Sequence, residues 1–219
     1  MSGEPTLILA SASPRRRELI ARLGFPCVFC ESGLDEDRIE APEPTALAVK
    51  LARMKARSVA SGVRRGVVIG CDTLVCLDGR VLGKPSHRDD ARQMLLALRG
   101  RTHDVMTAAA VLEAPTGREE SVVVTSRVRM HRFGQSVLSR YLDTGDSLDK
   151  AGAYGIQTAG AGLVESFSGC YLNIVGLPLC ELARLLGRFG MTPDPPHPAC
   201  ILPGGRVCPR WKDSPGLTM

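Results

Sequence analysis

Short apolar runs alternate along the chain with segments whose apolar residues recur every three or four positions. The first pattern is typical of buried strands and the second of amphipathic helices. The apolar runs predict strands at 6–10, 27–31, 67–71, 105–112, 121–131 and 162–166. The helical spacing predicts helices at 14–23, 43–60, 89–98, 135–144 and 178–189. Because strands slightly outnumber helices and alternate with them, we predict an α/β fold with a mixed β-sheet flanked by helices on both faces.

Local signals define several of these elements more sharply. Ser13 is a good N-cap for the first helix, Pro14 suits its first helical position, and Gly24 is a stop signal. Asp78-Gly79 stands between two β-type runs and predicts a tight hairpin. The run at 67–71 (VVIGC) is apolar on both faces, which indicates a central strand.

The composition changes near residue 190. Residues 191–219 hold 7 of the 15 prolines, a density that is incompatible with regular structure. We therefore predict one domain at 1–190 and a Pro-rich C-terminal tail at 191–219. The formal net charge of the chain is +5. The tail contributes only +1, since it has three basic and two acidic residues, so it is not a polybasic arm.

Composition and the N-terminus narrow the class of protein. A chain of 219 residues with 44% hydrophobic residues is too apolar to be disordered, and its 4% aromatic content disfavours a surface that stacks single-stranded bases. No apolar run approaches the roughly 20 residues that a membrane span needs. An acidic residue precedes the first apolar run and arginines follow it, the reverse of a secretory signal. We expect a cytoplasmic protein with no membrane or nucleic-acid partner.

The eight cysteines are mostly embedded in apolar runs, so we expect free thiols rather than a disulfide framework. Cys27-x-x-Cys30 is the spacing of half a zinc site. No second such pair accompanies it, and on a strand the two thiols face opposite sides. The sequence therefore disfavours zinc at this pair.

The segment 11–17 (SASPRRR) combines hydroxyl side chains with three arginines at a helix start. Cations are disfavoured there by the helix dipole, so a solvated basic turn is one interpretation. The turn also follows a buried strand, where α/β sheets bind ligands, and amides with an arginine fork form an anion site. We favour a phosphate site that includes Ser11, Arg15 and Arg16, and expect Arg17 to be solvated.

Asp72 directly follows the predicted central strand. A buried carboxylate is costly unless a metal or a partner holds it, so Asp72 is either a turn residue before the hairpin, a Mg²⁺ ligand or a general base. The acidic run Asp35-Glu36-Asp37 follows another strand and could add a second carboxylate. On its own, such a run is more often a solvated loop.

Three further positions could bind a nucleotide. Lys84 lies in Gly79-x-x-x-Gly83-Lys84-Pro85, which is one residue short of a P-loop and has proline where that loop needs a hydroxyl. Lys84 and Lys55 remain candidate phosphate contacts, although a helix lysine is usually solvated. Gln157 ends a segment rich in small residues, and its amide could read a base edge.

Other catalytic motifs are absent from the sequence. There is no GxSxG, GxGxxG or HExxH, and the four histidines lack metal-ligand spacing. His103 and His131 fall in or beside predicted strands, where we expect structural histidines with satisfied hydrogen bonds.

Taken together, these motifs resemble the Maf family of septum-formation-inhibitor-like nucleotide pyrophosphatases. The matching stretches occur in family order and span nearly all of residues 6–189. They are SASPRRRELI at 11–20, LDE at 34–36, LARMKA at 51–56, GCDTLV at 70–75, LGKP at 82–85, RTHDVMTAAAV at 101–111, DKAGAYGIQ at 149–157 and GCYLNIVGLPL at 169–179. The resemblance implies a two-lobed α/β fold with a twisted mixed sheet, similar to inosine triphosphate pyrophosphatase, and a nucleotide cleft between the lobes.

The resemblance also implies roles for individual residues. Asp72 matches the family's proton acceptor, and Glu36 with Asp72 matches acidic residues at a divalent metal, Mg²⁺ or Mn²⁺. The remaining matches fall into two groups: Arg15, Thr73 and Gln157 at positions linked to base selection, and Arg16, Lys55 and Lys84 around the phosphates. Cys71 replaces the usual alanine, a change of small residue that we expect to be tolerated. The tail matches nothing in the family.

The implied activity is hydrolysis of nucleoside triphosphates to the monophosphate and pyrophosphate. SPRR, DT and GIQ resemble the branch that acts on dTTP and UTP, with a house-cleaning role and a link to cell-division arrest. Two alternatives stay open: a pyrophosphatase for modified nucleotides such as 7-methyl-GTP or inosine triphosphate, and a nucleotide-sensing regulatory protein with little activity. The expected partner is a small-molecule nucleotide, and a homodimer is left open.

Overall fold

The structure is a computed structural model, and it describes residues 6–114, 116–192, 200–202, 205 and 207–208. Most of the predicted tail therefore lies outside the described residues. The chain divides into two compact units. The first unit comprises Met1–Asp72, Thr107–Val123 and Gly176–Met219, and the second comprises Thr73–Met106 and Val124–Val175.

The predicted mixed sheet is confirmed. Within the described residues the sheet has seven strands in the order β2-β1-β3-β5-β6-β7, with β4 paired to β3. Strand β1 pairs in parallel with β2 and β3, whereas the β3–β4 and β6–β7 pairs are antiparallel. The strands are β1 (Leu7–Ala10), β2 (Cys27–Cys30), β3 (Gly66–Leu77), β4 (Arg80–Leu82), β5 (Thr102–Ala114), β6 (Glu119–Met130) and β7 (Val164–Ser168).

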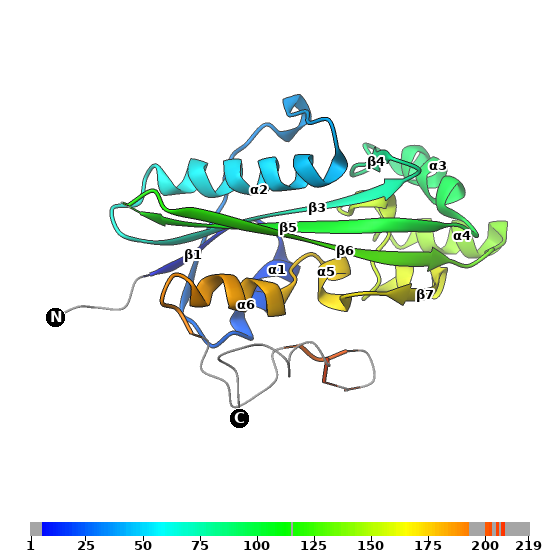
Figure 1. Cartoon of the computed structure of the whole chain (residues 1–219). Helices are drawn as coiled ribbons and strands as arrows, with labels where there is room; N and C mark the ends of the chain where they lie inside the picture. Colours follow the sequence, from blue (N-terminus) through cyan, green and yellow to red (C-terminus); the bar gives the residue numbers. More distant parts are fainter. Residues whose placement is uncertain (1–5, 115, 193–199, 203–204, 206, 209–219) are drawn as a thin grey trace. The chain divides into compact units, whose positions relative to one another are not determined.

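In the first unit, helices cover both faces of the strands (Figure 1). Helix α2 (Pro44–Ala60) lies on one face, and helices α1 (Pro14–Ala21) and α6 (Leu179–Gly187) lie on the other. The capping prediction for α1 is confirmed, since the Ser13 hydroxyl accepts a hydrogen bond from the Arg16 amide at 3.4 Å. A short 3₁₀ helix, η1 (Glu36–Arg38), precedes α2.

In the second unit, helices α3 (Arg88–Leu98) and α4 (Gln135–Asp143) pack around an apolar core. The fully buried members of that core include Leu95, Leu98, Val128, Met130 and Leu138. This unit also contains η2 (Ala151–Ala153), η3 (Ala159–Leu163) and α5 (Tyr171–Val175). Helix α5 is only five residues long, too short for a periodic pattern to reveal it in the sequence.

Strand β3 corrects one prediction. The strand does not end at residue 71 but continues to Leu77, so Asp72 lies within the strand rather than after it. The parallel pairing with β1 ends at the Ala10–Gly70 pair, and the antiparallel partner β4 then extends the strand from Val75 onward. Asp72 therefore stands just past the end of the parallel pairing. The predicted hairpin is confirmed, and both of its turn residues, Asp78 and Gly79, have positive φ as a type I′ turn requires.

Among the residues that the structure describes, no helix has both the length and the apolar character needed to cross a bilayer.

Candidate active site

Close packing of α2 on β3 brings Lys55 to Asp72. A Cβ atom at Gly70 would lie 2.0 Å from the Ala52 carbonyl oxygen, so only glycine allows the helix backbone to approach the strand this closely. Asp72 is two residues after Gly70 and shares its strand face, while Lys55 is one helical turn after Ala52. The Lys55 ammonium donates a hydrogen bond to Asp72 Oδ1 at 2.7 Å. Both side chains are buried, with residue exposures of 7% and 5%.

Glu36 completes this cluster. Its Oε2 accepts a second hydrogen bond from Lys55 Nζ at 2.8 Å. The Glu36 side chain is 44% exposed, so one edge of the cluster faces solvent. Of the acidic run, Glu36 reaches the cluster, whereas Asp35 pairs with Arg38 at 3.0 Å. Glu36 therefore contacts the buried Lys55 while its side chain stays partly in solvent.

The cluster fits a divalent cation. Asp72 Oδ2 is buried and has no hydrogen-bond partner, although its sister oxygen is paired with Lys55. A buried carboxylate oxygen without a partner is costly, and the two carboxylates carry one more negative charge than Lys55 offsets. Carboxylate oxygens are the ligands that Mg²⁺ and Mn²⁺ prefer. Asp72 and Glu36 are thus the residues suited to hold such an ion.

The hydroxyl and arginine residues at the start of α1 lie at the same end of the parallel strand pair. Ser11 follows Ala10, which is paired with Gly70 on β3. Arg16 Nε donates to the Gly176 carbonyl oxygen at 2.9 Å, and its Nη1 donates to the buried Ser11 hydroxyl at 3.4 Å. Arg16 is therefore held in place by two connecting segments of the first unit. Arg15 occupies the same first turn of α1 and is half-buried.

Arg17 differs from its prediction. It is half-buried, and its guanidinium carbon lies 5.2 Å from the centroid of the Phe29 ring, within cation–π range. The expectation of a solvated side chain is wrong because the exposed aromatic ring on β2 provides a packing surface for it.

Cys71 is fully buried beside this cluster. Burial raises the pKa of its thiol to about 11, although the positive charges of Arg16 and Lys55 oppose that rise. The thiol is therefore neutral at physiological pH and adds no charge next to Asp72.

Three candidates belong to the second unit. Thr73 is half-buried on β3 and follows Asp72 in the chain. Lys84 is exposed just after β4, and Gln157 is exposed in a turn that follows η2. Ser11, Arg15, Arg16, Glu36, Lys55 and Asp72 all belong to the first unit. Of these, Asp72, Lys55 and Glu36 form one hydrogen-bonded cluster. A separate hydrogen bond joins Arg16 to Ser11.

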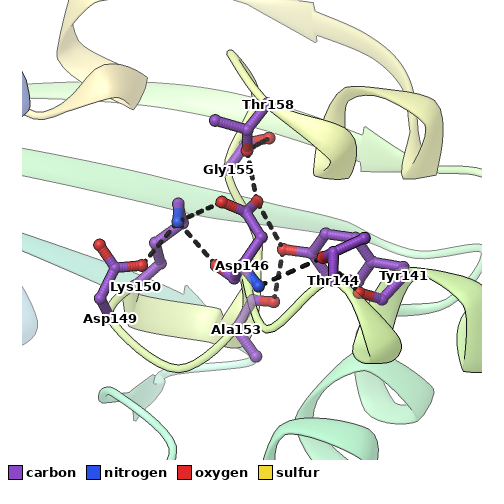
Figure 2. A network of polar contacts seen from close by, with 8 residues as sticks. All are labelled: Tyr141, Thr144, Asp146, Asp149, Lys150, Ala153, Gly155 and Thr158. Carbon is purple, nitrogen blue, oxygen red and sulfur yellow. Dashed lines mark hydrogen bonds and ion pairs between the residues drawn. The ribbon is translucent and has the colours of Figure 1, made fainter.

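A polar network holds the segment that carries Gln157 (Figure 2). The buried Lys150 ammonium bonds the carboxylates of Asp146 at 2.7 Å and Asp149 at 2.6 Å. Asp146 also accepts hydrogen bonds from the hydroxyls of Tyr141 and Thr158, the second of which is the residue after Gln157. Lys150 and Thr158 stand on either side of the segment of small residues. Their contacts therefore hold this turn within the second unit.

Sequence reasoning missed two features. Lys150 lies within the motif at 149–157 but no role for it follows from the sequence, yet its residue exposure is only 7%. A group of three buried cysteines (Cys180, Cys200 and Cys208) was also missed, because their spacing matches no metal motif. Only the folding of the chain brings them together.

The fold and the charged cluster define an α/β protein with a polar site at the carboxyl end of a parallel strand pair. The chain belongs to the Maf family: the family described as "Maf-like protein" matches residues 6–189. Similar proteins include a dTTP/UTP pyrophosphatase from Moorella thermoacetica, which is 48% identical over 185 residues, or 84% of this chain and 95% of the relative. Proteins of the same description from Dictyoglomus thermophilum and Symbiobacterium thermophilum are 44% and 43% identical, covering 84% of this chain and 96% and 94% of their own lengths.

Proposed function

We propose that this protein hydrolyses dTTP and UTP to the nucleoside monophosphate and pyrophosphate, with the Asp72 cluster as its catalytic centre. The observation that carries the proposal is the buried Asp72 carboxylate, of which one oxygen is paired with Lys55 and the other has no partner. The similarity to proteins described as dTTP/UTP pyrophosphatases supplies the substrate class.

The two oxygens of Asp72 have separate tasks in this proposal. Lys55 holds Oδ1 and fixes the side chain, which leaves Oδ2 to orient a water molecule and accept its proton. The water adds to phosphorus, the bridging bond between the α- and β-phosphates breaks, and pyrophosphate leaves. Arg16 and Arg15 stand where the carboxyl end of β1 meets a helix start, a place suited to a triphosphate.

Asp72 and Glu36 would hold Mg²⁺ or Mn²⁺, which supplies charge neutralisation of the phosphate oxygens when bound. Lys55 contacts both carboxylates and keeps them close together when no cation offsets their repulsion. In the second unit, Thr73 and Gln157 discriminate the pyrimidine and Lys84 contacts phosphate. The network around Asp146 gives the Gln157 turn a fixed position in its unit.

The test is pyrophosphate release from dTTP, UTP, CTP, GTP and 7-methyl-GTP with Mg²⁺. We expect dTTP and UTP to be the fastest, and Asp72→Asn to lower kcat by at least about 100-fold with little change in KM. Asp89→Asn, which removes an exposed carboxylate on α3, is the matched control and should retain the wild-type rate. A wild-type rate for Asp72→Asn would refute the assignment.

The same panel decides between the alternatives. Highest turnover with 7-methyl-GTP would replace the pyrimidine assignment by one for modified nucleotides. Nucleotide binding without Mg²⁺-dependent turnover would identify a nucleotide sensor instead of an enzyme.

A further inference from the structure

Three buried cysteine side chains converge on one point in the first unit. The Sγ atoms of Cys180, Cys200 and Cys208 all lie within 4.8 Å of one another. Their residue exposures are 2%, 0% and 4%. Cys180 is the second residue of α6, whereas Cys200 and Cys208 belong to the segment after residue 190. This point is separate from the Asp72 cluster, which uses none of these residues.

Backbone contacts beside the two later cysteines explain why their thiols lie on the same side. The Cys208 amide donates to the Cys200 carbonyl oxygen at 2.9 Å. Ile201 and Val207 form an antiparallel bridge next to that pair, and Gly205 has the positive φ of a tight turn. Cys200 and Cys208 are therefore opposite each other at the base of a small hairpin.

The three sulfur atoms form part of the buried contact between this segment and α6. Successive residues of a strand face opposite sides, so Cys200 is buried while its neighbour Ile201 is 43% exposed. The thiols of Cys200 and Cys208 are therefore the side chains that this segment places next to Cys180.

The spacing of the three sulfurs suits a tetrahedral metal ion. With Zn–S bonds of about 2.3 Å, tetrahedral thiolates stand about 3.8 Å apart, so sulfurs within 4.8 Å need only small side-chain shifts. Thiolates are soft ligands that select zinc over the hard cations Mg²⁺ and Mn²⁺. Cys180 lies in the first turn of a nine-residue helix, where the helix dipole favours a thiolate.

We propose that Cys180, Cys200 and Cys208 bind one Zn²⁺ ion, which fastens the C-terminal segment to α6. Each thiol releases its proton on binding, and a fourth donor completes the tetrahedron. The role of this ion is structural, since its ligands are buried and lie apart from the residues assigned to catalysis. The Maf family match ends at residue 189, so two of the three ligands lie in the part of this chain beyond it.

The first test is the zinc content of the purified full-length protein, measured by elemental mass spectrometry. We expect one zinc per chain in the wild type. Cys180→Ser, Cys200→Ser and Cys208→Ser should each lose the zinc, whereas Cys30→Ser, the control at an exposed cysteine on β2, should keep it. Co²⁺ substitution should give a thiolate-to-metal charge-transfer band in the wild type and in Cys30→Ser alone. Zinc retained in the Cys200→Ser and Cys208→Ser variants would overturn the proposal.

A second measurement needs no variant and remains informative if a serine variant fails to fold. Limited proteolysis within 191–219 should accelerate when a zinc-selective chelator treats the wild-type protein, and added Zn²⁺ should restore the protection. Protection that resists the chelator but is lost with a thiol reductant would mean a disulfide among these cysteines, and would overturn the proposal. Pyrophosphate release is assayed separately, so a failure of the zinc site is distinguishable from a failure of the proposed activity.

Discussion

At the scale of single residues, the two oxygens of Asp72 illustrate how burial prepares a side chain for chemistry. Removing one partner of a buried ion pair typically costs about 3–5 kcal/mol, so Lys55 is an important partner for the buried Asp72 carboxylate. The same pairing leaves Oδ2 without a partner. A carboxylate with one hydrogen-bonded oxygen and one oxygen without a partner is a site that a ligand or a metal can complete.

His103 is a second buried residue whose titration has a measurable consequence. Its Nε2 contacts the Tyr154 hydroxyl at 2.7 Å, but its Nδ1 is buried without a partner, so the prediction of a fully satisfied histidine is only half right. Burial lowers the pKa of His103 from 6.5 to about 4. Between these values the unfolded chain binds a proton that the folded chain does not.

Stability contributed by neutral His103 should therefore be present above pH 6.5 and be lost as the pH falls towards 4, by up to about 3 kcal/mol. We expect His103→Gln, which can still bond Tyr154, to flatten this part of the pH dependence. The measurement is the free energy of urea unfolding from pH 7.5 to 4 in the wild type and the variant. His131→Gln, at an exposed histidine, is the control. Parallel curves for the wild type and His103→Gln would contradict the prediction.

At the scale of elements, the sequence predicted the features that depend on interactions between neighbouring residues. The Ser13 cap, the Asp78-Gly79 hairpin and the apolar strand predicted at 6–10 depend on neighbouring residues. All three are confirmed, the strand as Leu7–Ala10. The extent of β3 depends on which partner it pairs with after Gly70, and no local pattern encodes that partner.

The candidate site divides in the same way. The charged residues could be recognised by their motifs, but the Lys55–Asp72 bond joins positions 17 residues apart and exists because α2 packs tightly on β3. The cysteine group is harder still, because 19 residues of sequence separate Cys180 from Cys200. Spacing rules describe ligands within one turn or hairpin and cannot anticipate ligands that tertiary structure assembles.

Gly70 is where the packing of these two elements can be tested. A methyl group there would meet the backbone of α2 at Ala52, which cannot rotate away as a side chain can. We expect Gly70→Ala to lower the free energy of unfolding by about 3 kcal/mol, the upper part of the range for overpacking. We also expect a loss of turnover, because Lys55 moves with the helix. Urea unfolding and pyrophosphate release measure the two effects.

The matched control is Gly62→Ala, in the turn after the same helix. A Cβ at Gly62 would make only an ordinary contact, 3.8 Å from the Val59 carbonyl oxygen. Its effect should stay within about 0.5 kcal/mol. If the two alanine variants unfold at the same urea concentration, close packing at Gly70 is not what sets the position of α2.

At the scale of the whole molecule, part of the excess positive charge is concentrated in one place. The formal net charge is +5, and three arginines stand consecutively at the start of α1. Arg16 and Lys55 act together on Cys71, which places their charges near one buried point of the first unit. Three consecutive arginines at one helix start suit a small polyanion better than the extended backbone of a nucleic acid, whose binding requires charge spread along a surface.

Binding of such a polyanion should appear as stabilisation of the entire fold. A ligand that binds only the native state, present at a concentration 100 times its Kd, adds about 2.7 kcal/mol to the free energy of unfolding. For a chain of this size, that raises Tm by roughly 5–10 °C. We expect this shift with Mg²⁺ and an α,β-methylene analogue of dTTP, which cannot be hydrolysed at the proposed bond. The dGTP analogue at the same concentration should shift Tm less, because the role proposed for Gln157 and Thr73 is to select a pyrimidine base. Thymidine should shift Tm least, because it lacks the phosphates that Arg16 and Arg15 would bind.

Equal shifts from the two analogues would contradict the pyrimidine preference but not the triphosphate site. A shift from thymidine as large as that from the dTTP analogue would contradict the triphosphate site itself. Differential scanning fluorimetry at matched concentrations separates these outcomes, since each depends on a different part of the nucleotide.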